Sequence, residues 1–65
     1  MTFKEAKVLA RQGVKMKHEY FAYDEYITIH GNVVIFEDGV EIFVDEWLKR
    51  KDYLLIGWEK FQKQK

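Results

Sequence analysis

The feature that most constrains the fold is the stretch of residues 26–44, which reads YITIHGNVVIFEDGVEIFV. The pairs Gly31-Asn32 and Asp38-Gly39 are typical hairpin-turn sequences. They divide the stretch into three short runs rich in β-branched and aromatic residues. This pattern predicts a three-stranded antiparallel meander onto which the rest of the chain packs.

The spacing of the two turns predicts which residues of the meander share a face. With two-residue turns, the facing pairs are Ile29 with Val34, Ile27 with Phe36, and Val34 with Phe43. These pairs build one apolar face for a helix. The opposite face then carries Val33, Ile35, Val40, Ile42 and Val44 beside Tyr26, Thr28 and His30. Because this face is also largely apolar, we expect a homo-oligomer, either a dimer or a tetramer, in which it meets a copy of itself.

Signals at both ends predict a helix before the meander. Thr2 and Glu5 have the spacing of a capping box, and Gly13 can adopt the positive φ angle that ends a helix. The apolar residues at helical spacing between them are Phe3, Ala6, Leu9 and Ala10. Residues 14–21, VKMKHEYF, alternate with a period of two, which predicts a strand whose lysines protect a sheet edge.

After the meander, Asp45 is a good N-cap, and residues 45–52 read as about two helical turns that bury Trp47 and Leu48. Residues 53–61, YLLIGWEKF, predict a last strand, in which Gly57 marks a bulge or the close approach of another backbone or a ligand. The expected architecture is therefore α+β. An N-terminal helix packs on a five-stranded antiparallel sheet, with a short second helix before the last strand.

Composition indicates one small domain over residues 1–65. There is no cysteine, which excludes disulfides and thiolate metal sites. Lys plus Arg equal Asp plus Glu at 11 each, so no net field favours nucleic acid or an anionic membrane as a partner. The chain shows neither an apolar run of membrane-spanning length nor a signal-peptide pattern, so we expect a cytoplasmic protein.

Catalytic signatures are missing from the sequence, which contains no glycine-rich phosphate loop and no serine. His18 and His30 fall on different predicted strands, and each reads as an ordinary polar strand residue. Glu37 and Asp38 read as a solvated hairpin tip. We therefore expect no enzyme activity, no metal site and no cofactor.

Aromatic residues make up 17% of the chain, more than a small core needs. Lys15 and Lys17 project from the same side of a predicted strand, next to several of these aromatics. The basic residues 49–51, in contrast, suit the end of a helix. Aromatic faces beside Lys17 and His18 could hold a nucleotide, with the base stacked and the phosphates bound by charge-assisted hydrogen bonds.

The order of these motifs resembles small phage domains of the Tad2 type, which are anti-Thoeris proteins. The matching pieces are Phe3 with Ala6, Gly13, the basic strand that ends at Phe21, the helix start at residues 45–48, and the pair Trp58-Glu59. The resemblance covers nearly the whole chain.

This resemblance implies a non-catalytic phage anti-defence protein. Such a homo-oligomer captures a cyclic nucleotide or cyclic ADP-ribose immune signal in an aromatic pocket. By position, Phe3, Phe21 and Trp58 would take the place of the pocket aromatics of the family. With the two polar candidates, the expected ligand-binding residues are Phe3, Lys17, His18, Phe21 and Trp58.

A second reading is a small phage inhibitor that docks on a host protein through its sheet edge or an aromatic patch. Direct DNA binding ranks third, because the net charge is zero.

Overall fold

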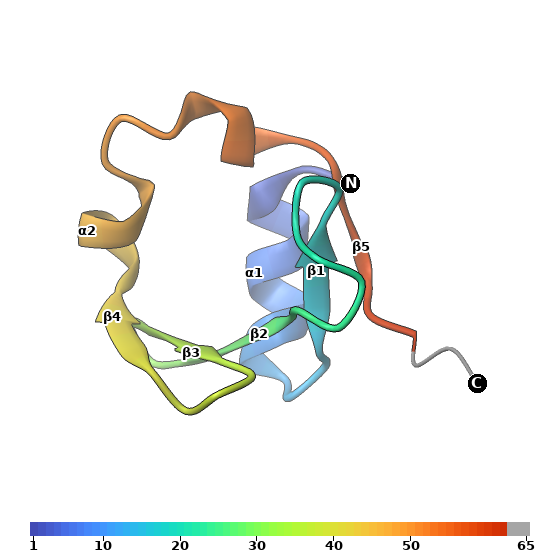
Figure 1. The fold of residues 1–65 in the computed structure, drawn as a ribbon. Coiled ribbons are helices and arrows are strands. Elements are labelled where there is room, and N and C mark those ends of the chain that lie inside the picture. The colour runs from blue at the N-terminus through green and yellow to red at the C-terminus, as the bar shows by residue number, and fades with distance from the viewer. Residues whose placement is uncertain (63–65) are drawn as a thin grey trace.

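The computed structural model describes residues 1–62 and confirms the α+β architecture. The elements in chain order are α1 (Phe3–Arg11), β1 (Met16–His18), β2 (Ile27–His30), β3 (Val33–Phe36), β4 (Glu41–Phe43), α2 (Val44–Leu48), the 3-10 helix η1 (Asp52–Leu55) and β5 (Trp58–Lys60). The strands form one antiparallel sheet in the order β4-β3-β2-β1-β5. Figure 1 shows this sheet bent around α1, with the N-terminus beside β5.

The two ends of α1 form as the sequence predicts. The Glu5 N–H donates to the Thr2 hydroxyl at 3.3 Å, and the Thr2 N–H donates to the Glu5 carboxylate at 3.1 Å, which completes the capping box. At the other end, Gly13 has φ +91°. The Gly13 N–H bonds to the Ala10 carbonyl and the Val14 N–H to the Leu9 carbonyl, the pattern of a Schellman motif.

The first turn of the meander also agrees with its prediction. Gly31 has φ +62°, and a two-residue turn pairs Ile29 with Val34. The second turn is longer than predicted. The Phe36 N–H donates to the Val40 carbonyl at 2.9 Å, so the loop holds three residues, 37–39. Gly39, at φ +88°, supplies the left-handed residue that such a loop requires.

The extra loop residue shifts β4 by one position, so the predicted pairing of Val34 with Phe43 is wrong. Val34 faces Ile42, and Val33 faces Phe43. A shift of one residue exchanges the two faces of a strand. Ile42 therefore packs against the core, whereas the Phe43 side chain is 61% exposed on the other face.

The prediction that β1 is an edge strand is also wrong, because β1 lies between β2 and β5. The Glu19 N–H donates to the Gly57 carbonyl and the Phe61 N–H to the Lys15 carbonyl, each at 2.9 Å. Strand side chains project from the faces of a sheet, so lysines on β1 leave its backbone groups free to pair.

Three other elements differ from their predicted lengths. β1 ends at His18, where the chain turns and the Phe21 N–H bonds to the His18 carbonyl. α2 begins at Val44 without a side-chain cap and ends at Leu48, so Asp45 is not its N-cap and the basic residues 49–51 lie beyond its last turn. The predicted last strand divides into η1 and the shorter β5.

The core lies between α1, α2 and the concave face of the sheet. Its buried apolar residues are Phe3, Ala6, Ala10, Met16, Ile27, Ile29, Val34, Val44, Trp47, Leu54 and Trp58. Within residues 1–62, no helix is long and apolar enough to cross a membrane.

The shifted β4 register predicts unequal effects for two neighbouring substitutions. Ile42→Ala should lower the free energy of unfolding by about 1–2 kcal/mol because it removes partly buried methyl groups. Phe43→Ala should lower it by less than about 0.5 kcal/mol because the ring is exposed. Urea unfolding at low protein concentration measures both values, and a larger loss for Phe43→Ala would contradict the register.

The capping box predicts a pH-dependent contribution to stability. Hydrogen bonds from the Thr2 backbone and then from its side chain lower the pKa of the Glu5 carboxyl below 4.5. A carboxyl whose pKa is lower in the folded state stabilises the fold above its unfolded pKa, and this contribution is lost as the pH falls through the folded pKa. Glu5→Gln should therefore lower Tm at pH ~7 and change it little near pH ~3. Glu37→Gln is the matched control, and parallel Tm curves for parent and Glu5→Gln would contradict the prediction.

Candidate functional site

Aromatic rings from four parts of the chain meet on the concave face of the sheet. The ring of Trp58 in β5 lies 5.6 Å from that of Phe3 in α1, 5.6 Å from that of Phe21 and 6.0 Å from that of Trp47 in α2, measured between centroids. Tilted and edge-on contacts of this kind are favourable for aromatic pairs. The structure thus brings together three predicted site residues, Phe3, Phe21 and Trp58, as part of one packed cluster.

The His18 ring packs against Trp58 in this cluster, and hydrogen bonds to backbone groups hold it in place. Its Nε2 lies 2.9 Å from the Tyr53 carbonyl and 2.6 Å from the Ile56 carbonyl. Its Nδ1 accepts the Tyr20 N–H at 3.1 Å. Carbonyls only accept and a backbone N–H only donates, so Nε2 carries the proton and Nδ1 does not. Both ring nitrogens are therefore occupied by protein groups.

Burial leaves little surface of three predicted site residues open to a ligand. The exposed fractions are 7% for Phe3, 1% for His18 and 3% for Trp58. Phe21 is partly buried against the same core. In the single chain these side chains pack the interior, and their direct contact with a ligand stays a prediction.

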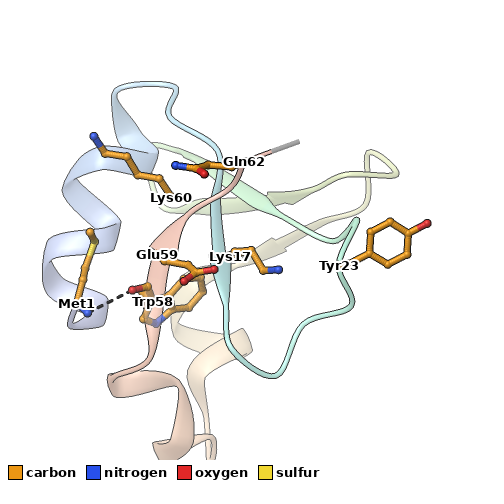
Figure 2. A pocket seen from close by; sticks show the side chains of 7 residues that line it. All are labelled: Met1, Lys17, Tyr23, Trp58, Glu59, Lys60 and Gln62. Carbon is orange, nitrogen blue, oxygen red and sulfur yellow. Dashed lines mark hydrogen bonds between the residues drawn. The ribbon is translucent and has the colours of Figure 1, made fainter. Parts of the chain in front are cut away.

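Lys17 lies on the other face of the sheet, where its neighbour across β1 and β5 is Glu59. A pocket of about 490 Å³ opens here (Figure 2). Its lining residues are Met1, Lys17, Tyr23, Trp58, Glu59, Lys60 and Gln62. Lys17 extends toward the segment that carries Tyr23. We call this space the β5 pocket.

Residues near the N-terminus close one side of the β5 pocket. The Met1 amino group donates to the Trp58 carbonyl at 3.2 Å, drawn as a dashed line in Figure 2, and the Trp58 N–H donates to the Met1 carbonyl at 3.1 Å. Each residue thereby satisfies the backbone of the other, as in an antiparallel pair. This contact covers part of the outer edge of β5.

The chemistry of the β5 pocket suits a ligand with both an anionic group and a ring. Lys17 provides an ammonium group on the face that it shares with Glu59, whereas Lys60 pairs with Met16 and its ammonium group points to the other side, toward α1 (Figure 2). The Tyr23 side chain is 79% exposed and offers a ring face. Within residues 1–62, no group of three His, Asp or Glu side chains could hold a metal ion.

Among these lining residues, Lys17 and Trp58 are predicted site residues. Met1, Tyr23, Glu59, Lys60 and Gln62 are not. Glu59 becomes a neighbour of Lys17 only through the pairing of β1 with β5, which the sequence does not predict. Tyr23 lies in a connection without regular structure, so no periodicity could place it.

A second exposed feature is an apolar patch beside the His18 ring. The Tyr20 and Tyr53 rings lie 5.8 Å apart, and both contact the His18 ring. Leu55 and Ile56, on the same segment as Tyr53, are 54% and 67% exposed. We call Tyr20, Tyr53, Leu55 and Ile56 the tyrosine patch.

The His18 hydrogen bonds predict a large effect on stability. His18→Leu would leave the carbonyls of Tyr53 and Ile56 and one backbone N–H without a partner, so it should lower the free energy of unfolding by about 2–4 kcal/mol. His30→Leu, on an exposed strand end, should change it by less than about 0.5 kcal/mol. Urea unfolding at one fixed protein concentration compares the two variants. Equal midpoints for parent and His18→Leu would contradict a structural role for this ring.

Comparisons with protein-family models, curated proteins and solved structures gave no match. The likeness to Tad2-type domains therefore stays a prediction that depends on the sequence motifs.

Proposed function

We propose that this chain is a non-catalytic phage anti-defence protein that, as a homo-oligomer, captures a cyclic nucleotide or cyclic ADP-ribose signal. The observation that carries the proposal is the β5 pocket, which combines Lys17 with an exposed tyrosine. A captured signal would no longer reach the immune effector that it activates.

The size and charges of the pocket support a ligand of this class. About 490 Å³ lies within the range of ~300–1,000 Å³ usual for small-molecule sites. Charge-assisted hydrogen bonds from Lys17 suit phosphate oxygens. Stacking of one base on an aromatic ring such as Tyr23 contributes roughly 1–3 kcal/mol.

The predicted site residues divide into two roles in this proposal. Lys17 lines the pocket and would contact the ligand. Phe3, His18 and Phe21 pack around Trp58 from the inside and so fix the position of β5. A displaced β5 would move Glu59 and Lys60, so substitutions in the cluster would weaken capture indirectly.

The tyrosine patch favours a second candidate, a protein-binding module that docks on a host protein. Exposed tyrosines beside aliphatic side chains are typical of the centres of protein interfaces. This candidate predicts a stable complex in host lysate without any small-molecule ligand.

A depletion assay tests the proposed capture. Purified protein is mixed with cyclic nucleotides and cyclic ADP-ribose isomers, removed by filtration, and then heated to release what it holds. We expect one ligand to disappear from the filtrate and to return chemically intact. Lys17→Glu should weaken capture by about tenfold or more, because a phosphate would then meet a carboxylate.

Lys49→Glu makes the same charge change outside the pocket and is the matched control. Equal weakening by Lys17→Glu and Lys49→Glu would contradict the β5 pocket as the site. Chemical conversion of the ligand would contradict a non-catalytic protein, and a Tyr53→Ser variant that loses a host partner would favour the protein-binding module.

A further inference from the structure

The charges of this neutral chain are separated along the sequence. No Lys or Arg lies between Lys17 and Lys49. The acidic residues in that interval are Glu19, Asp24, Glu25, Glu37, Asp38, Glu41, Asp45 and Glu46, eight of the 11 in the chain. Five of them, Glu37, Asp38, Glu41, Asp45 and Glu46, lie between the end of β3 and the end of α2, so the β4 end of the sheet is acidic.

An apolar groove lies within this acidic end. It has a volume of about 220 Å³ and is lined by Val33, Glu41, Ile42 and Phe43. Phe43 and the neighbouring Val40 are 61% and 55% exposed. We call this surface the acidic groove. An apolar groove with carboxylates at its rim fits an apolar surface that carries cations.

The same chain carries a surface of the opposite character on α1. Lys4, Val8 and Arg11 follow one another at i, i+4 and i+7, so they lie along one side of the helix. Val8 is 54% exposed, and both basic residues are exposed. We call these three residues the basic stripe. It lies on the side of α1 away from Phe3, Ala6 and Ala10. The Arg11 Nε donates to the Gly31 carbonyl at 3.1 Å, which leaves its terminal NH2 groups for a partner.

We infer that the acidic groove of one copy receives the basic stripe of a second copy. Val8 would contact Phe43, and Lys4 and Arg11 would approach the carboxylates of Glu41 and Asp45. A contact of two acidic grooves would bring like charges together and is disfavoured. The groove and the stripe occur on every copy, so the chain supplies its own partner.

This inference rests on the homo-oligomer of the proposed function and changes how its copies meet. The sequence predicts that one sheet face packs against the same face of a copy. The charges instead favour a contact between two different surfaces. None of the groove or stripe residues lines the β5 pocket.

The inference is tested by exchanging the charges of Lys4 and Glu41. Sedimentation of the full chain at about 50 mM and about 500 mM NaCl measures its self-association. We expect the parent to associate at low salt and to dissociate at high salt. Lys4→Glu and Glu41→Lys should each raise the dissociation constant about tenfold or more. Lys4→Glu places an acid in the first turn of α1, where the helix dipole favours it, so this variant should still fold. The double variant with both changes in one chain should recover the affinity of the parent to within about threefold.

Asp52→Lys makes the same charge change as Glu41→Lys outside the groove and should associate like the parent. A parent that sediments as a monomer at both salt concentrations would overturn the inference. So would single variants that associate normally, or a folded double variant that fails to recover. Ligand capture is measured on the same samples, so failed capture with intact association would count against the proposed function alone.

Discussion

The hydrogen bonds of the buried His18 ring hold the second half of this fold in place. One imidazole binds the carbonyls of Tyr53 and Ile56 and accepts a backbone N–H from the turn after β1. The Trp58 indole N–H adds a 2.6 Å bond to the Leu54 carbonyl. Carbonyls that would otherwise need a neighbouring strand are thus satisfied by two side chains. This explains why the segment before β5 forms a 3-10 helix rather than a longer strand.

The packing of His18 against this segment also determines which residue can occupy position 57. Its φ of +92° lies in the left-handed region, and a Cβ there would lie 2.6 Å from a Glu19 carboxylate oxygen and 3.0 Å from the His18 Nε2. Only glycine combines that backbone angle with so close an approach. Gly57 therefore marks a close approach, but the atoms that approach belong to the side chains of Glu19 and His18 rather than to another backbone or a ligand.

Local signals were predictable from the sequence, and distant pairings were not. The capping box, the end of α1 at Gly13 and the two-residue turn at Gly31 depend on residues within a few positions of one another. The interior position of β1 depends on a strand about 40 residues later. The β4 register depends on whether the second loop has two or three residues. The pair Asp38-Gly39 does not decide this, because both loops can place Gly39 at a positive φ angle. The strand alternation of residues 14–21 predicts on which face Lys17 lies, so this pocket residue could be named from the sequence. Tyr23 lies in an irregular connection, where no periodicity predicts the direction of a side chain.

A chain of 65 residues cannot give its large aromatic side chains to a ligand and also build a core. Phe3, Trp47 and Trp58 are all buried, so they support the fold rather than an open binding surface. Under the proposed function, recognition would then use exposed groups that project from elements the core has fixed. The β5 pocket meets this condition, because Trp58 anchors β5 from one face while Lys17 and Glu59 lie on the other. Interior packing and ligand chemistry can therefore vary independently on the two faces of one strand pair.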